Sequence, residues 1–162
     1  MDKNNFIIKS MNRELSTRNG KYKIVPSSYL ILIRDRDILL QRRYRTGYED
    51  GNYGFIAGHV EEKETFLEAL IREAKEESGL SLQAKDLDVA HVMHRRGPTD
   101  ERVDVFIRAR KWLGNPKIME PDKCDEMGWF AIDALPDNVI PYIRQAIACI
   151  DKNIFYSEHG WR

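Results

Sequence analysis

The sequence lacks the hallmarks of disulfide-stabilised, zinc-binding and membrane-spanning proteins. Its 162 residues include only two cysteines, Cys124 and Cys149, which form no Cys-x-x-Cys pair and no cluster with histidine. This spacing argues against a disulfide scaffold and against a zinc site, and it favours buried or idle thiols. No segment approaches the roughly 18 apolar residues that a membrane span requires. A soluble cytoplasmic protein is therefore the simplest interpretation.

The sequence also lacks a net charge. Lysine and arginine together number 26, and aspartate and glutamate together number 26. No strong electrostatic field therefore favours a nucleic-acid polymer or a membrane surface, and we expect neither as a partner. The length suits one domain with a substantial core.

The first part of the chain has little to bury. Residues 1–24 are polar and mixed in charge, so we interpret them as an N-terminal extension and assign the domain to residues 25–162. The sequence leaves open whether the extension packs on the fold, caps a homodimer or stays mobile. The aromatic tail, residues 155–161, is open to docking on the body of the protein or on a second subunit.

Between these ends, strand-like and helix-like patterns alternate. Residues 29–33 and 38–43 are β-rich runs separated by a polar turn, which predicts a hairpin. A second hairpin is predicted from residues 87–93 and 102–110, and a short strand at Trp129 and Phe130. A turn with an N-cap at residues 136–138 is expected to lead into a helix over residues 141–152.

The chain is organised around a predicted helix over residues 65–78, which Gly79 ends. Four apolar residues repeat with helical spacing and form one stripe that faces a core: Leu67, Leu70, Ile71 and Ala74. Beside this stripe, Glu73, Glu76 and Glu77 share a ridge of the helix. Like charges at these spacings repel each other, so the ridge needs a compensating positive charge.

Two sources of that charge are available. Arg72 lies four residues from both Glu68 and Glu76, but one guanidinium cannot neutralise the whole ridge. A hard divalent cation, Mg²⁺ or Mn²⁺, prefers carboxylate oxygens and binds through a few carboxylates plus substrate phosphates. The alternative is an ordinary amphipathic helix with a solvated acidic face.

The stretch from Gly58 to Leu80 resembles the signature of the Nudix hydrolases. Every defined position of that signature is filled, with a small alanine at one apolar site: Gly58, Glu64, Arg72, Glu73, Ala74, Glu76, Glu77, Gly79 and Leu80. The resemblance covers roughly residues 25–150. It implies an α+β fold, the Nudix-type α/β/α sandwich with a mixed β-sheet.

The resemblance also implies a metal site. Glu73, Glu76 and Glu77 would bind Mg²⁺ or Mn²⁺, and Arg72 would orient the glutamates through Glu64 or Glu76. The main-chain carbonyl of Ala57 would be a further metal ligand. Many relatives have a proline in the loop before the signature glycine, and this chain has none there.

Further residues follow from the likeness to MutT-like members of the family. Arg43 falls where these members have a phosphate-contacting arginine, and Arg42 precedes it at the same strand end. The alternative is that both are solvated basic residues. A loop glutamate that reaches the metal or its water corresponds to Glu120, with Glu101 as the alternative. The general base would be Glu120 or one of the signature glutamates.

Other polar and aromatic residues have weaker assignments. His91 and His94 have no acidic or cysteine partner at metal-binding spacing, so we expect them to have local structural roles. Several aromatic residues are potential stacking partners for a base, although core packing is the alternative for each. They are Tyr44, Tyr48, Tyr53, Trp129 and Phe130.

The predicted function is metal-dependent hydrolysis of a diphosphate linkage in a nucleotide. The favoured substrate is a nucleoside triphosphate, cleaved to a monophosphate and pyrophosphate. Nucleotide sugars, ADP-ribose and dinucleoside polyphosphates are alternative substrates. Two other classes stay open: a noncatalytic nucleotide-sensing domain and an isomerase of isoprenoid diphosphates. The isomerase would need a catalytic cysteine near the site.

Overall fold

The computed structural model describes residues 17–18 and 21–161. Most of the predicted extension, residues 1–24, lies outside the described residues. Within it, strands β1 (Thr17–Arg18) and β2 (Lys21–Tyr22) pair antiparallel as a small separate sheet.

The central sheet has five strands in the order β11-β8-β9-β3-β7. Their bounds are β3 Val25–Ile31, β7 Ala57–His59, β8 Leu87–Arg96, β9 Glu101–Ala109 and β11 Tyr156–His159. Strands β3 and β9 run parallel, whereas β8 and β9 form the predicted second hairpin and β7 runs antiparallel to β3. The predicted mixed β-sheet is therefore confirmed.

A second sheet packs beside the first. It consists of β4 (Ile33–Arg34), β5 (Asp37–Arg43), β6 (Tyr53–Gly54) and β10 (Cys124–Ala131). The predicted single strand over residues 29–33 is wrong, because the chain leaves the central sheet after Ile31 and enters the second sheet at Ile33. The first hairpin is confirmed only at its tip, where Ile33 pairs with Ile38.

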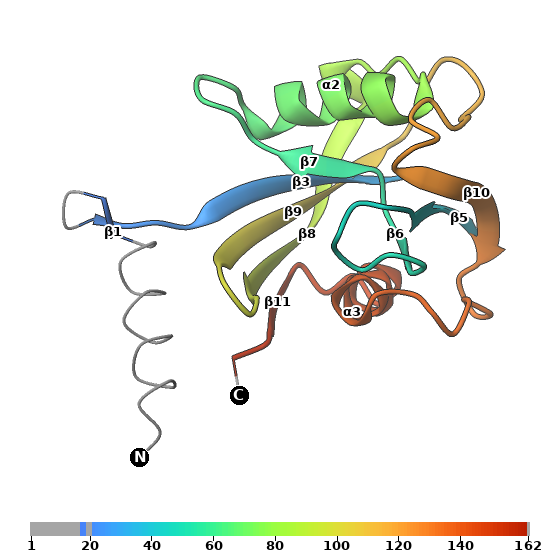
Figure 1. Ribbon diagram of the computed structural model, residues 1–162. Helices are drawn as coiled ribbons and strands as arrows, with labels where there is room; N and C mark the ends of the chain where they lie inside the picture. Colours follow the sequence, from blue (N-terminus) through green and yellow to red (C-terminus); the bar gives the residue numbers. More distant parts are fainter. Residues whose placement is uncertain (1–16, 19–20, 162) are drawn as a thin grey trace.

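Alternate side chains at the end of β3 and at Leu32, which follows it, pack into two hydrophobic cores. Leu30 and Leu32 pack with helix α2 (Phe66–Ser78), and Tyr29 and Ile31 pack with helix α3 (Pro141–Asp151). Figure 1 shows the two helices on opposite sides of the strands. The predicted α+β sandwich is thus confirmed. In the described ranges, no helix is both long and apolar enough to cross a membrane.

Helix α2 has the predicted span, with strong signals at both ends. Thr65 is the N-cap, and its hydroxyl accepts a hydrogen bond from the Glu68 amide while the Glu68 carboxylate accepts one from the Thr65 amide. At the other end, Gly79 adopts the left-handed conformation with φ 71°. These caps fix which residues face the sheet, so they also fix the position of the acidic ridge.

The C-terminal part differs from prediction in one detail. The N-cap of α3 is Ile140, with no side-chain cap and with Pro141 in the first turn, so the N-cap predicted at residues 136–138 is wrong. The tail docks on the body of its own chain, because β11 adds to the sheet parallel to β8. The buried His91 contacts the carbonyl of Ile154 and the hydroxyl of Ser157, which confirms its local structural role.

The capping box gives a stability prediction. Thr65→Ala removes the hydroxyl that accepts from the first turn of α2, and we expect it to lower the free energy of unfolding by about 1 kcal/mol. Urea unfolding followed by circular dichroism measures the change. The matched control is Thr99→Ala, at an exposed position in the β8–β9 turn. Equal stability of both variants and wild type would contradict the role of the cap.

Candidate active site

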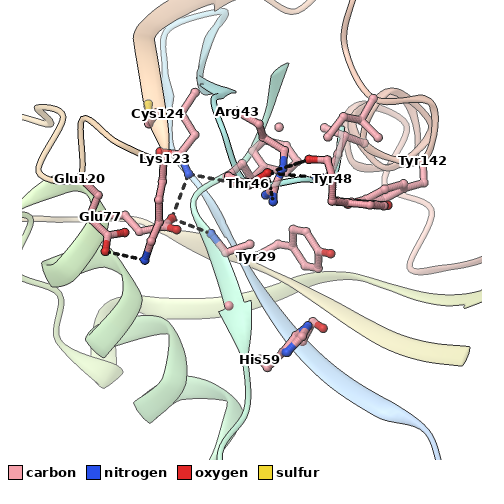
Figure 2. Close-up of a pocket in the computed structure, with 18 of the residues that line it drawn as sticks. Tyr29, Arg43, Thr46, Tyr48, His59, Glu77, Glu120, Lys123, Cys124 and Tyr142 are labelled. Atoms are coloured by element: carbon pink, nitrogen blue, oxygen red, sulfur yellow. Dashed lines mark hydrogen bonds and ion pairs between the residues drawn. The ribbon is translucent and has the colours of Figure 1, made fainter. Parts of the chain in front are cut away.

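A cavity of about 370 Å³ opens between the two sheets and α3. Figure 2 shows Glu77 and Glu120 on one side of it, Tyr142 on the other, and Tyr29 between them. Four of the predicted site residues line this cavity: Arg43, Ala57, Glu77 and Glu120. Glu77 of the signature helix therefore lies at the same cavity as Arg43, Ala57 and Glu120.

Arg72 joins several residues of the signature through hydrogen bonds and ion pairs. Its guanidinium donates to both carboxylate oxygens of Glu64, at 2.8 and 2.9 Å, and to Glu73 Oε1 at 2.6 Å. It also donates to the carbonyl oxygen of His59 at 3.2 Å. The hydrogen bonds from Arg72 lower the pKa of the Glu64 carboxyl to about 2. Arg72 thus ties the helix to the loop before it and to the end of β7.

Glu73 lies directly under Gly58. A Cβ atom built on Gly58 would be 1.9 Å from Glu73 Oε1, so only glycine lets this carboxylate lie against the strand. The Glu73 side chain is 14% exposed, and its burial raises its pKa despite the opposing effect of Arg72. Glu76 lies outward at 54% exposure, and Arg72 Nη1 contacts its Oε2 at 3.5 Å.

Glu77 is the most buried carboxylate of the ridge. Its Oε2 accepts hydrogen bonds from Gln41 Nε2 at 2.9 Å and from the Ala57 amide at 3.2 Å. Burial, helped by the nearby negative charges of Glu73 and Glu120, nevertheless raises the pKa of Glu77 to about 7. A carboxylate with this pKa exchanges protons readily near neutral pH.

The sequence interpretation missed two residues at this end of the cavity. Lys123 Nζ pairs with Glu120 Oε1 at 2.8 Å, and Gln41 binds Glu77. Lys123 follows Glu120 by three residues, a spacing that signals contact only when the loop between them is a turn. The alternative to Glu120, Glu101, pairs with His94 at 2.6 Å and does not line the cavity.

The two arginines at the end of β5 have different surroundings. Arg43 lines the cavity and donates to the Tyr48 carbonyl at 2.7 Å and to the Thr46 hydroxyl at 3.0 Å. Arg42 pairs with Asp125 at 2.8 Å and with Glu126 at 3.2 Å, and it is not among the residues that line the cavity.

The carboxylates fit a hard divalent cation in donor type. Glu73, Glu77 and Glu120 all offer carboxylate oxygens, and burial, with a smaller contribution from neighbouring negative charges, raises the pKa of Glu73 and of Glu77. Within the described part of the chain, no three acidic, histidine or cysteine side chains converge as a ready metal cage. Glu73 instead faces Arg72, and Glu120 faces Lys123. The carboxylates are therefore present, but Glu73 and Glu120 are held by cationic partners and Glu77 by the amides of Gln41 and Ala57.

The other end of the cavity is made by residues that the sequence interpretation did not select. They are Ser27, Tyr29, His59, Arg102 and Tyr142. They come from three strands and α3, so only the strand register brings them together. Among the predicted stacking residues, Tyr48 lines the cavity. Tyr53 is buried against Phe130.

In a comparison with protein-family models, residues 25–148 of the chain match the NUDIX domain. Among curated proteins, the NAD-capped RNA hydrolase NudC of Pseudomonas putida (strain GB-1) is 28% identical over 114 residues, which cover 70% of this chain and 39% of that protein. The chain thus spans about two fifths of the length of this curated relative.

Solved structures show the same fold. The MutT NUDIX hydrolase from Burkholderia pseudomallei superposes with a TM-score of 0.71 at 28% identity, covering 78% of this chain and 97% of that chain. An ADP-ribose pyrophosphatase from Streptococcus suis 89-1591 has a TM-score of 0.55 at 15% identity, covering 85% of this chain and 98% of that chain. The second likeness concerns the fold alone.

The buried Glu77 predicts a pH-dependent stability. The pKa of Glu77 is about 7 in the folded state and has its usual value of 4.5 in the unfolded state. Between these two pH values the folded state keeps a proton that the unfolded state releases. The free energy of unfolding of the metal-free protein should therefore fall as the pH rises from 4.5 to about 7. Glu77→Gln should remove roughly 1 to 3 kcal/mol of the stability difference between about pH 5 and about pH 8.

Urea unfolding in EDTA at the two pH values measures this difference. The control is Glu62→Gln, at an exposed position ahead of α2, which should keep the wild-type pH dependence. If Glu77→Gln and wild type had parallel pH profiles, the buried carboxyl would not be the source.

Proposed function

The chain belongs to the NUDIX domain family, and from this premise we propose that it is a hydrolase that cleaves a diphosphate linkage in a nucleotide at the cavity beside α2. Nudix hydrolases generally use divalent metal ions. In this chain Glu73, Glu76 and Glu77 would hold Mg²⁺ or Mn²⁺, together with Glu120 and the carbonyl of Ala57. The observation that carries the proposal is the group of carboxylates at one end of the cavity, where Glu77 and Glu120 line it and Glu73 lies close by against Gly58 of β7.

The side chains around the cavity have distinct tasks in this proposal. Arg72 holds Glu73 in place and fixes Glu64, and Gln41 fixes Glu77. When bound, the metal ion supplies Lewis acidity toward phosphoryl oxygens and a water of lowered pKa. Attack of water on phosphorus forms one P–O bond and breaks the bridging one, and a carboxylate takes the proton. Glu77 and Glu120 are the candidates for this base because both line the cavity.

The leaving group and the remaining phosphates need cationic contacts of their own. Arg43 and Lys123 line the same cavity, and both offer N–H donors to phosphate oxygens. Arg43 also orders the loop that it contacts through Thr46 and Tyr48. We assign Arg43 to phosphate contact. Arg42 has a supporting role, because its pairs with Asp125 and Glu126 join β5 to β10.

Two substrate classes are supported. A nucleoside triphosphate, cleaved to monophosphate and pyrophosphate, is favoured by the likeness to a MutT hydrolase of similar length. A second candidate is NAD or another dinucleotide, because the curated relative is an NAD-capped RNA hydrolase. A panel with Mg²⁺ or Mn²⁺ separates them: the nucleoside triphosphates, NAD, ADP-ribose, nucleotide sugars and dinucleoside polyphosphates.

The proposed mechanism predicts how turnover changes when one of the metal-binding carboxylates is replaced by a neutral amide. Glu73→Gln and Glu77→Gln should each lower turnover of the best substrate in the panel at least about hundredfold, since each loses a metal-binding carboxylate. Thermal unfolding with and without Mn²⁺ gives a second readout, because a ligand bound only to the folded state raises the melting temperature. The variants should lose this rise.

Glu62→Gln serves as the control for one lost acidic charge and should keep both turnover and the Mn²⁺-dependent rise. Full turnover in Glu77→Gln would defeat the assignment. Nucleotide binding without turnover in wild type would instead identify the noncatalytic class, and conversion of an isoprenyl diphosphate without phosphate release would identify the isomerase class.

A further inference from the structure

The end of the cavity away from Glu120 is polar and is built on the central sheet. Ser27 on β3 pairs in register with His59 on β7 and with Asp104 on β9, so these side chains share one face of the sheet. Arg102 lies two residues before Asp104 and therefore extends the same face. Ser27, His59 and Arg102 all line the cavity, and none of them is at a defined position of the signature.

The charges at this end are balanced within the protein. Arg102 Nε donates to Asp100 Oδ2 at 2.8 Å, and the buried Arg95 pairs with the buried Asp104. Each guanidinium thus has its own carboxylate. No surplus positive charge remains among these four residues, so a phosphate has little electrostatic reason to bind here. An uncharged polar group fits this end better.

The hydrogen-bonding groups at this end are incompletely used. Ser27 is 2% exposed as a whole residue, and its buried hydroxyl has no partner among the described residues. Arg102 Nη1 lies 3.0 Å from His59 Nε2. A guanidinium can only donate, so Nε2 accepts and the proton of the neutral ring lies on Nδ1. A serine hydroxyl and an imidazole N–H are therefore available to a ligand that carries acceptors.

Aromatic side chains complete this end. Tyr29 is buried and stacks on Phe106 with ring centroids 4.7 Å apart, and Tyr142 meets Tyr29 edge-on at 6.3 Å. Tyr48 lines the cavity from the loop that Arg43 orders. Flat apolar walls with a few polar groups are typical of sites that bind planar heterocycles.

We propose that this end of the cavity binds the heterocyclic base of the nucleotide, with Ser27, His59 and Arg102 recognising hydrogen-bond acceptors on the base. The inference rests on the proposed function, since it assigns another part of the same substrate. It sets the direction in which the nucleotide lies: phosphates toward Glu77, Glu120 and Lys123, and base toward β3, β7 and β9. The three residues would then determine base specificity rather than take part in the hydrolytic step.

Binding in EDTA tests the subsite without requiring turnover. Isothermal titration compares AMP, GMP, CMP and UMP with ribose 5-phosphate, which has no base. Wild type should bind at least one of the four nucleotides more tightly than ribose 5-phosphate. Ser27→Ala and His59→Phe keep the approximate shape of the side chain but remove its hydrogen bonds. Each should weaken the binding of that nucleotide about tenfold and leave the binding of ribose 5-phosphate unchanged.

The matched control is Ser28→Ala on the same strand, because Ser28 faces α2 and its hydroxyl donates to the Phe66 carbonyl. It should bind all five probes as wild type does. Where a nucleotide is hydrolysed, Ser27→Ala should raise KM about tenfold and keep kcat within about twofold, since the lost contact is distant from the reacting phosphate.

Equal binding of the chosen nucleotide by wild type, Ser27→Ala and His59→Phe would overturn the subsite, and so would equal binding of all four nucleotides and ribose 5-phosphate by wild type. Base-dependent binding in a protein that hydrolyses none of the panel would support the subsite while the proposed function failed. The two failures are therefore distinguishable.

Discussion

The close approach of β7 to α2 is the constraint on which the rest of the site depends. Gly58 leaves room for the carboxylate of Glu73 where any Cβ atom would collide with it. Arg72 then spans the same junction, from Glu64 in the preceding loop to the carbonyl of His59. Because both contacts join helix to strand, they set the distance between the acidic ridge and the cavity. Glu64 and Gly58 of the signature therefore both hold together one junction, the joint between β7 and α2.

Local signals made much of this joint predictable. The capping pair Thr65 and Glu68 and the left-handed Gly79 determine the span of α2 within a few residues, and helical periodicity alone places Glu73, Glu76 and Glu77 on one ridge. Alternation likewise predicted the hairpin of β8 and β9. These features depend on neighbours close in sequence, where backbone geometry and hydrogen-bond chemistry leave few alternatives.

Features that depend on register between distant strands were not predictable. An apolar run such as residues 29–33 does not reveal that its side chains feed two cores or that the chain changes sheet at Leu32. The base-binding end proposed above needs the parallel pairing of β3 with β9, which brings Ser27 beside Asp104. The ion pair of Lys123 with Glu120 depends on the conformation of a loop. No single segment carries these contacts, so a pattern within one segment cannot reveal them.

Each end of the cavity contains buried groups that destabilise the unliganded protein, and the groups differ between the two ends. This difference favours a substrate that binds in one orientation. At the α2 end the cost is that of burying carboxylates, since burial raises the pKa of both Glu73 and Glu77 despite their hydrogen bonds from Arg72 and Gln41. At the β3 end the cost is an unmade hydrogen bond, since the buried Ser27 hydroxyl lacks a partner within residues 17–18 and 21–161, and such a group costs about 1–3 kcal/mol. A cation with phosphates relieves the first cost and cannot relieve the second. A neutral base relieves the second and not the first. A nucleotide bound with its metal ion therefore relieves both costs only when its phosphates lie toward α2 and its base lies toward β3.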